Sequence, residues 1–275
     1  MNPPPYADWI GRREQTQECL SGNLVKRIAA TLGQAAPAPG DVLPPLWHWA
    51  FFQPAIDQLA LGRDGHPAHL PLLPPTGNRN RMWAGGRMEF FEPLRVDAQA
   101  TRSSTLLNVE EKAGRTGALL FATLRHDYLQ DGNLCLREDQ DIVFREPNPP
   151  RLGDGEAMPP ADWQDNVEPT TTLLMRYSAV TFNTHRIHYD WPYATGVEGY
   201  PGLVVHGPLI ATLNLRAFCR ANPDVRLRSF AYRGVRPLIA PEPFQVGGRI
   251  SAPGKAELWA GDERGIAQQA ELTFD

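Results

Sequence analysis

Cysteine is scarce in this sequence, with only three residues of this type among 275. Cys19, Cys135 and Cys219 lie far apart, and none of them belongs to a CxxC pair. This spacing argues against a disulfide framework and against a cysteine-based zinc site. We therefore expect three reduced thiols in a cytoplasmic protein.

Long hydrophobic runs are also missing. No segment approaches the roughly 20 apolar residues that a transmembrane helix needs. The first five residues, MNPPP, have neither the basic nor the apolar region of a signal peptide. Both absences predict a cytoplasmic protein without a membrane partner.

Charge of one sign is not in large excess, since the net charge is only -4. This balance gives no reason to expect nucleic acid as a partner, while it still allows a local basic pocket for an anionic ligand. Hydrophobic residues make up 42% of the chain and charged residues 21%. Such a composition is typical of a globular protein and argues against disorder.

A helical repeat is the first positive signal along the chain. Leu24, Ile28 and Leu32 recur every four residues, and this spacing predicts a helix with one buried face. Ser21 is a favourable capping residue at the start, and Gly33 suits the position after the end. We predict a helix between these two residues.

Two regions carry the alternating pattern of antiparallel strands. The first spans residues 87–145, and the second spans residues 226–274 and follows a helix predicted over about 206–220. One helix with four or five antiparallel strands therefore occurs twice. The pattern predicts an α+β fold in which two antiparallel sheets are each wrapped round a central helix.

The two units are expected to be separate domains. Residues 148–168 are dense in proline and glycine, which indicates a linker. We therefore predict an N-terminal domain over residues 1–147 and a C-terminal domain over residues 169–275.

The segment Thr181–Asp190 concentrates strong hydrogen-bonding groups. Asn183, His185 and His188 fall within six residues of it. Because an unperturbed histidine has a pKa of about 6.5, it can take up and return a proton near neutral pH. His188 is the candidate for proton transfer in this segment.

A second motif, His206-Gly207-Pro208, stands where the second helix is predicted to begin. The backbone N–H of Gly207 is then unobstructed and lies at the positive end of the helix dipole. A donor of this kind can hold a carbonyl oxygen that becomes negative during a reaction, and it is worth roughly 3 kcal/mol. Together with a proton-transfer group, it describes a site that forms an enolate from a thioester.

Simpler interpretations of the same residues stay open at this point. His206 beside a helix start can be a structural hydrogen-bonder, and Arg186 can be a solvated surface charge. A His-x-x-His pair alone is weak evidence for a metal site, because only Asp190 offers a further ligand nearby. Ser178 lacks the surroundings of a nucleophile elbow. The residues alone favour an acid/base site only modestly.

At these residues the sequence resembles the MaoC-like hydratase and dehydratase superfamily, whose members have the hot-dog fold. The resemblance runs through the motif position by position. Asn183 stands where the family has an aspartate, and His188 stands where it has its catalytic histidine. The remaining matches are His185 at the family's asparagine, Arg186 at its proline, Ile187 at its apolar residue, Ala194 at its trailing alanine, and His206-Gly207 at its helix start, whose glycine N–H forms the oxyanion hole.

The segments 182–190 and 198–209 resemble the type-2 hydroxyacyl-thioester dehydratases more narrowly. Within that group the likeness is strongest to enzymes that hydrate the C5 dicarboxylyl-CoA thioesters mesaconyl-C4-CoA and itaconyl-CoA. The resemblance covers nearly the whole chain and implies a double hot-dog fold. Its first half, which includes residues 83–90, resembles the degenerate hot-dog domain that precedes the catalytic one in that group. A homodimer is compatible with such a chain.

The resemblance implies a hydro-lyase acting on an acyl-CoA substrate. CoA is then part of the substrate, with no separate cofactor and no metal. An (R)-3-hydroxyacyl-thioester dehydratase of fatty acid metabolism, a hot-dog thioesterase and a non-catalytic acyl-CoA-binding protein are the alternatives. Hydrolysis normally uses a carboxylate to activate water, which Asn183 does not supply, although Asp190 or Glu198 are nearby in sequence.

The implied catalytic residues are Asn183, His188 and Gly207. An amide cannot accept a proton at neutral pH, so Asn183 departs from the family pattern. We expect His188 to be the acid/base, and the side-chain carbonyl of Asn183 to orient the attacking water.

A C5 dicarboxylyl substrate carries a free carboxylate, which the guanidinium fork of arginine binds best. Arg186 within the motif and Arg79, Arg81 and Arg87 in the first half are candidates, and the sequence does not discriminate among them. The residues predicted to contact the substrate are His185, Arg186, His206, Arg81 and Arg87.

Overall fold

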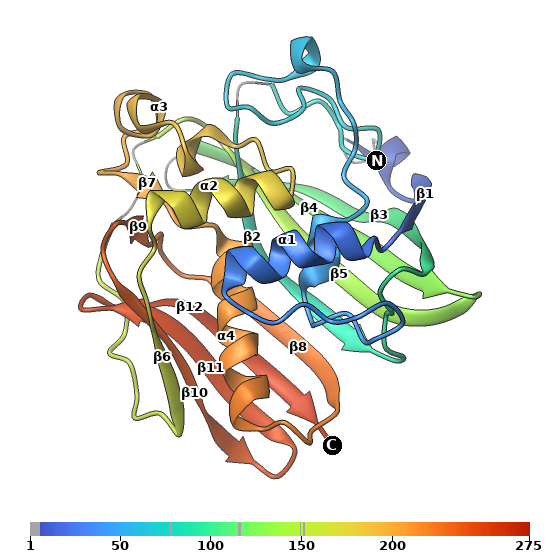
Figure 1. The fold of residues 1–275 in the computed structure, drawn as a ribbon. Helices are drawn as coiled ribbons and strands as arrows, with labels where there is room; N and C mark the ends of the chain where they lie inside the picture. The colour runs from blue at the N-terminus through green and yellow to red at the C-terminus, as the bar shows by residue number, and fades with distance from the viewer. Residues whose placement is uncertain (1–5, 78, 115–116, 149, 151) are drawn as a thin grey trace.

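The computed structural model describes residues 6–77, 79–114, 117–148, 150 and 152–275. The chain has an α+β fold built on one antiparallel sheet of ten strands, with helices lying over one face (Figure 1). The strands are ordered β1-β3-β4-β5-β2-β8-β12-β11-β10-β6. The first five of these strands come from the first half of the chain and the last five from the second half.

The first half consists of a central helix and five strands. Its elements are β1 (Arg13–Cys19), α1 (Gly22–Leu32), β2 (Asn80–Phe90), β3 (Gln99–Gly114), β4 (Gly117–Gln130) and β5 (Asn133–Arg145), with short 3-10 helices η1 (Ala7–Trp9), η2 (Trp47–Ala50) and η3 (Gln58–Ala60). The predicted helix is confirmed as α1, in which the Ser21 hydroxyl accepts a hydrogen bond from the N–H of Asn23. Gly33 ends it in the left-handed conformation, with φ at 65°.

The second half repeats this plan and adds short helices around its motifs. Its elements are β6 (Trp163–Val167), α2 (Thr171–Val180), η4 (Arg186–His188), α3 (Trp191–Gly196), β7 (Leu203–Val204), α4 (Gly207–Ala221), β8 (Leu227–Gly234), β9 (Ile239–Ala240), β10 (Phe244–Ala252), β11 (Lys255–Asp262) and β12 (Gly265–Phe274). The second predicted helix is therefore found as α4. The expected linker at 148–168 contains β6, which pairs with β10 as an edge strand, so its last part belongs to the sheet. The division into two domains stays a prediction.

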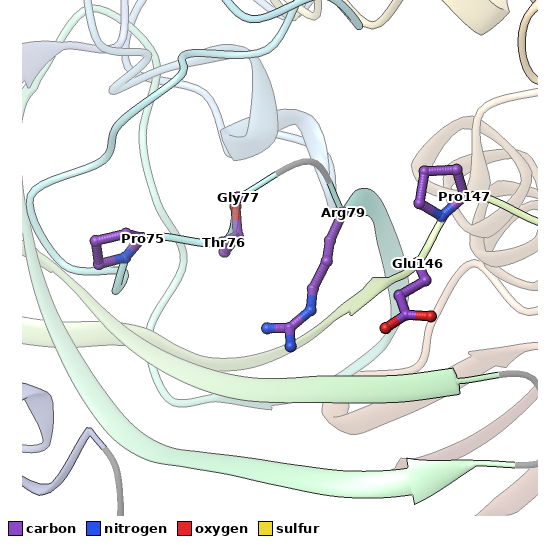
Figure 2. Close-up of a pocket in the computed structure, with 6 residues that line it drawn as sticks. All are labelled: Pro75, Thr76, Gly77, Arg79, Glu146 and Pro147. Carbon is purple, nitrogen blue, oxygen red and sulfur yellow. The ribbon is translucent and has the colours of Figure 1, made fainter.

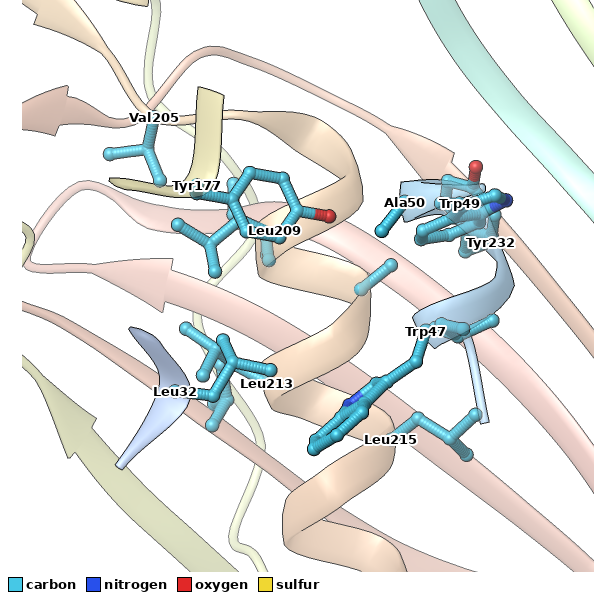
Figure 3. Close-up of a cluster of buried hydrophobic side chains, with 14 of the residues drawn as sticks. Leu32, Trp47, Trp49, Ala50, Tyr177, Val205, Leu209, Leu213, Leu215 and Tyr232 are labelled. Atoms are coloured by element: carbon cyan, nitrogen blue, oxygen red, sulfur yellow. The ribbon is translucent and has the colours of Figure 1, made fainter. Parts of the chain in front are cut away.

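The two predicted sheets are joined edge to edge through β2 and β8, with Arg87 opposite Ala231. Helices α1 and α4 cover the same face of the joined sheet (Figure 1). The main core lies between this face and the helices. Figure 3 shows Leu209, Leu213 and Leu215 of α4 among side chains from α1, α2, η2 and β8. The hydrophobic core is thus shared by both halves, which fixes the helix starts relative to each other.

A β-bulge in β2 determines which of its side chains face this core. The register against β5 shifts between Trp83 and Gly85. Met88 and Trp83 both pack against the main core, although they are five positions apart and regular alternation would put them on opposite faces. Because alternation is reversed across the bulge, Arg81 shares the inner face with Trp83, whereas Arg87 faces outward.

Candidate active site

The motif of the second half forms a tight turn between α2 and η4. Phe182 adopts a left-handed conformation with φ at 49°. The side-chain oxygen of Asn183 accepts a hydrogen bond of 3.0 Å from the N–H of His185. This Asx-type turn orients the chain into η4, so one role of Asn183 is to shape the loop. The predicted contact of Asn183 with a water stays a prediction.

His188, at the end of η4, is oriented by the backbone. Its Nδ1–H donates a hydrogen bond of 2.7 Å to the carbonyl oxygen of Val204. The other ring nitrogen, Nε2, therefore carries the lone pair. Burial lowers the pKa of His188 to about 4, against the opposing effect of the Val204 carbonyl. At neutral pH the ring is a neutral imidazole that can accept a proton through Nε2.

His206 holds this ring next to the start of α4. The two imidazoles are stacked, with centroids 3.7 Å apart and planes 17° from parallel. Nε2 of His206 shares a hydrogen bond of 2.8 Å with the hydroxyl of Ser178. His206 is fully buried, and burial holds its pKa well below the ordinary value. Its surroundings are those of a positioning side chain and give no support to the predicted contact with substrate.

Gly207 is the first residue of α4, and among the residues that the structure describes no side chain makes a capping hydrogen bond at this helix start. A Cβ atom added at Gly207 would meet nothing within 4 Å. Within the described part of the chain the N–H of Gly207 has no hydrogen-bond acceptor, and it lies at the positive end of the helix dipole. The neutral imidazole of His188 stacks on His206, the residue directly before this backbone donor, and the formation of an enolate requires a base and a donor of these kinds.

The rings of His206, His188, His185 and His66 follow one another in contact, and we call them the histidine row. This row continues from the second half of the chain into the first. His185 lies edge-on to His188 at 5.4 Å between centroids, and its other neighbour is His66 at 4.3 Å. His66 belongs to a loop of the first half, residues 60–68, which we call the dyad loop. Its Nδ1–H donates a hydrogen bond of 3.1 Å to Oδ2 of Asp64. The sequence interpretation missed this pair, although Asp64-Gly65-His66 was visible as a short polar motif.

Asp64, His66 and His185 bring three potential ligand atoms within 4.8 Å of one another. Residues of these types can bind a metal ion. A cation, Arg81, is close enough to lower the pKa values of both histidines by its charge, after the larger effect of burial. The absence of a metal stays a prediction.

The comparisons with known proteins agree with this geometry. Residues 46–240 match the family described as "Hydroxyacyl-thioester dehydratase type 2". The chain belongs to this family. A mesaconyl-C(4)-CoA hydratase of Chloroflexus aurantiacus is 41% identical over 251 residues, which cover 90% of this chain and 89% of that protein.

Solved structures of low sequence identity share the fold. HtdX of Mycobacterium tuberculosis superimposes with a TM-score of 0.69 at 19% identity, covering 95% of this chain and 99% of that one. A second protein of that organism, described as having a double hot-dog fold, gives a TM-score of 0.60 at 13% identity and covers 97% and 96%. The predicted double hot-dog fold is therefore confirmed.

Membership of the type-2 dehydratase family confirms that the chain is a hydro-lyase of acyl thioesters. Within the described residues no helix combines the length and hydrophobicity needed to cross a bilayer. Whether the protein is cytoplasmic stays a prediction.

Three of the four candidate arginines of this dehydratase are bound by the protein itself. Arg186 donates to Asp190 and to the carbonyl of Arg63, and its guanidinium lies 4.1 Å from the centre of the Tyr193 ring. Arg87 pairs with Asp141 on the outer face of β2. Both residues were predicted to bind substrate, and the structure supports neither prediction, because one guanidinium is occupied and the other faces away.

Arg79 lies at a surface pocket of about 380 Å³ on the first half (Figure 2). Its guanidinium forms an ion pair with Glu111, and Glu146 also lines the pocket. Two carboxylates beside one arginine leave little positive charge for an anionic ligand.

Arg81 differs from the other three candidates. Among the residues that the structure describes, its guanidinium has neither a hydrogen bond nor an ion pair. Burial lowers its pKa, and the charge of Asp64 opposes this shift. An arginine remains protonated at neutral pH. Arg81 is therefore a half-buried cation beside the histidine row with its donors free.

Proposed function

We propose that this protein hydrates a C5 dicarboxylyl-CoA thioester, mesaconyl-C4-CoA or itaconyl-CoA, to citramalyl-CoA. The observation that carries the proposal is the unpaired Arg81 beside the histidine row. An enzyme for simple enoyl chains has no use for an unpaired, half-buried cation at this place. The identity to a mesaconyl-C(4)-CoA hydratase supports the same substrate class. CoA is then part of the substrate, and no separate cofactor is needed.

The chemistry starts at the thioester carbonyl. Its oxygen accepts a hydrogen bond from the N–H of Gly207 and takes up negative charge as the enolate forms. Nε2 of His188 removes a proton from water while the water oxygen bonds to the β-carbon. In mesaconyl-C4-CoA, whose double bond joins the α- and β-carbons, the same proton then passes from His188 to the α-carbon, which completes the addition of water. In itaconyl-CoA the double bond joins the β-carbon to a methylene group, so the proton passes to that methylene carbon instead.

Arg81 gives the site its preference for a dicarboxylyl chain. In mesaconyl-C4-CoA the free carboxylate is attached to the β-carbon, the atom that water attacks. The guanidinium fork can bind both oxygens of this carboxylate. Binding it here also fixes the β-carbon close to the histidines, so affinity and orientation come from one contact.

Hydrolysis of the thioester has less support. Of the two carboxylates considered for it, Asp190 caps α3 and binds Arg186. Glu198 is buried and accepts hydrogen bonds from Asn80 and Tyr193. Because both carboxylates are engaged inside the protein, neither is available to activate a water molecule.

The test is a substrate panel with two matched variants. Mesaconyl-C4-CoA, itaconyl-CoA and crotonyl-CoA are each incubated with the enzyme, and loss of the enoyl absorbance and release of free thiol are followed separately. We expect loss of the enoyl signal without thiol release, and a preference for a C5 ester. Arg81→Gln should reduce kcat/KM for the C5 esters about 10- to 100-fold, the equivalent of roughly 1.5–3 kcal/mol for hydrogen bonds to a charged group.

Arg87→Gln is the control, because it removes an arginine from the outer face of the same strand and should leave all three rates unchanged. Hydration of crotonyl-CoA by the Arg81 variant should equal that of the wild type. Equal use of crotonyl-CoA and the C5 esters by the wild type would refute the substrate proposal. Thiol release would indicate a thioesterase instead.

A further inference from the structure

The dyad loop of the first half is tied closely to the motif of the second half. The N–H of Arg186 donates a hydrogen bond of 2.9 Å to the carbonyl of Asp64, and the hydroxyl of Thr184 donates to the carbonyl of Gly65. Gly65 has a φ of 89°, and a Cβ there would lie 2.0 Å from the carbonyl oxygen of Thr184. Only glycine allows this approach. The contact is therefore built into the fold.

Asp64 fixes the orientation and tautomer of His66. Its Oδ1 accepts a hydrogen bond of 3.1 Å from the backbone N–H of His66, and its Oδ2 accepts one from Nδ1. Burial alone would raise the pKa of Asp64, but the hydrogen bonds and charge of His66 outweigh it and lower the pKa. An ionised Asp64 keeps the proton on Nδ1, so Nε2 of His66 carries a lone pair, as Nε2 of His188 does.

An unsatisfied polar atom marks the space beside this dyad. Nε2 of His185 is buried and has no hydrogen-bond partner within the described part of the chain. Buried nitrogen atoms are nearly always hydrogen-bonded, so an unpaired one indicates a place for a water or a ligand group. The side chains of His66 and Asp64 retain 18% and 16% exposure, which leaves the dyad accessible to a small molecule.

The charge at this place favours a water and an anion over a metal ion. Arg81 acts on both His66 and His185, as its effects on their pKa values show. A cation so close repels a divalent ion and attracts the carboxylate next to the double bond. The water that attacks the β-carbon must then lie between the carboxylate site and the histidines.

We propose that His66 is a second catalytic residue of the hydration and that Asp64 is its positioning residue. This inference rests on the proposed function. The first half of the chain thereby supplies the group that Asn183 does not provide. Nε2 of His66 accepts a hydrogen bond from one O–H of the attacking water and directs the oxygen lone pair at the β-carbon.

The proton balance of the step involves both histidines. His188 removes the other proton of the water as the O–C bond forms at the β-carbon. In an α,β-unsaturated ester such as mesaconyl-C4-CoA, the electron pair of the double bond moves to the thioester, whose oxygen is held by Gly207. The α-carbon then takes the proton back from His188, while His66 keeps its own protonation state throughout.

The test compares His66→Gln with His69→Gln. His69 is an exposed histidine directly after the dyad loop, so its variant controls for the loss of a histidine from this region. Rates are measured with whichever of mesaconyl-C4-CoA, itaconyl-CoA and crotonyl-CoA the wild type hydrates fastest. We expect kcat to fall on the order of 100-fold for His66→Gln with KM nearly unchanged, because a misplaced reactant costs about that factor. His69→Gln should match the wild type.

Asp64 is tested by rescue. Asp64→Asn should lower kcat and leave KM nearly unchanged, and Asp64→Glu should recover part of the lost rate, because a carboxylate is restored. Circular dichroism and thermal unfolding of each variant separate a loss of activity from a loss of fold. A merely structural role for Asp64 would reduce the unfolding temperature together with the amount of active enzyme, without a selective effect on kcat.

Each remaining outcome decides between the two proposals. A wild type that prefers crotonyl-CoA but depends on His66 refutes the substrate proposal and keeps this inference. A folded His66→Gln variant with wild-type kcat overturns the inference and leaves the substrate proposal intact. A folded wild type that hydrates none of the three esters overturns both. If dialysis against EDTA abolishes activity and added Zn²⁺ restores it, the three residues bind a metal and the inference is wrong.

Discussion

The central helices of the two halves start with the same residue type, but their N-termini differ in chemistry. Both start at a glycine, Gly22 in α1 and Gly207 in α4. At α1, Oδ1 of Asp97 accepts a hydrogen bond of 2.6 Å from the N–H of Gly22, and the hydroxyl of the capping residue Ser21 accepts one from the N–H of Asn23 in the same turn. At α4 no side chain of the described residues caps the start. The first half satisfies its helix dipole internally, whereas the second half leaves that position open for a ligand oxygen.

The polar groups between helix and sheet repeat this contrast. In the first half, Glu138 is fully buried and accepts hydrogen bonds from Trp49, Tyr128 and Gln140, with His48 at 3.2 Å. Burial would raise the pKa of Glu138, but these partners and nearby histidine charges hold it at about 2. Both carboxylate oxygens of Glu138 are hydrogen-bonded, so this network stabilises the fold and leaves no free acceptor for a substrate.

The corresponding part of the second half keeps polar atoms unpaired. Nε2 of His185 and Nδ1 of His206 are buried without partners in the described structure. Unpaired buried groups cost stability, and active sites retain such groups because they bind substrate or water. Two copies of one fold can therefore differ in function because one copy pairs its buried hydrogen-bonding groups and the other leaves some of them without a partner.

The largest expected effect comes from removing the base of the second half. His188→Ala should lower kcat by about 10² to 10⁴-fold, the usual contribution of a positioned proton-transfer group. Hydration of the preferred enoyl-CoA ester by the purified, folded variant measures it. His69→Ala serves as the control. Near-normal activity of the His188→Ala variant would show that another residue is the base. The contrast between the polar groups of the two halves would then no longer hold.

The next largest effect tests the open helix start. Gly207→Pro removes the N–H, while proline is well tolerated at the first position of a helix. The preceding residue, His206, already has the extended conformation that proline requires, with φ at -62° and ψ at 127°. We expect a fall in kcat of about 10² to 10³-fold, as for the loss of one oxyanion-hole donor.

Gly207→Ala is the matched control for this change, because it keeps the N–H and its methyl group meets no protein atom. It should lose much less activity than Gly207→Pro. Equal losses in the two variants would mean that the free space beside Gly207 matters and that its N–H does not.

These features were not equally predictable from the sequence. Helix α1 and its caps were predicted because the signals are local, and the His188 and Gly207 motifs were predicted for the same reason. Two strands of the ten-stranded sheet escaped prediction, β1 and β6, and they are its two edge strands. The short pair β7 and β9 was not predicted either. The sequences of β1 and β6 are mostly polar and lack the alternation of a half-buried strand, because an edge strand buries little.

Long-range contacts account for what the site analysis missed. The dyad loop reaches the motif through a hydrogen bond between residues 119 positions apart, Thr184 and Gly65. No local pattern contains this information. Similarly, Arg81 and Arg87 look equivalent in the sequence, since they are six positions apart on one strand and an even spacing would place them on the same face. A one-residue bulge between them puts them on opposite faces, and only one reaches the histidines.

The smallest expected effect tests the closed helix start of the first half. Asp97→Ala removes the acceptor of the Gly22 N–H and should reduce the free energy of unfolding by about 1–2 kcal/mol, the cost of a lost cap. Asp97→Asn should cost less than about 1 kcal/mol, because its amide oxygen can still accept and only the charge at the helix start is lost. Urea unfolding measures both values.

The catalytic rate should be unchanged in both Asp97 variants, since α1 is not expected to hold the substrate carbonyl. A Cβ at Gly22 would lie 2.7 Å from Oδ2 of Asp97, so this carboxylate fills the space that remains free at Gly207. A change in KM on freeing the Gly22 N–H would show that the first half also binds the thioester. The two helix starts would then have the same function, and the only difference would be that the Asp97 carboxylate normally occupies the one in the first half.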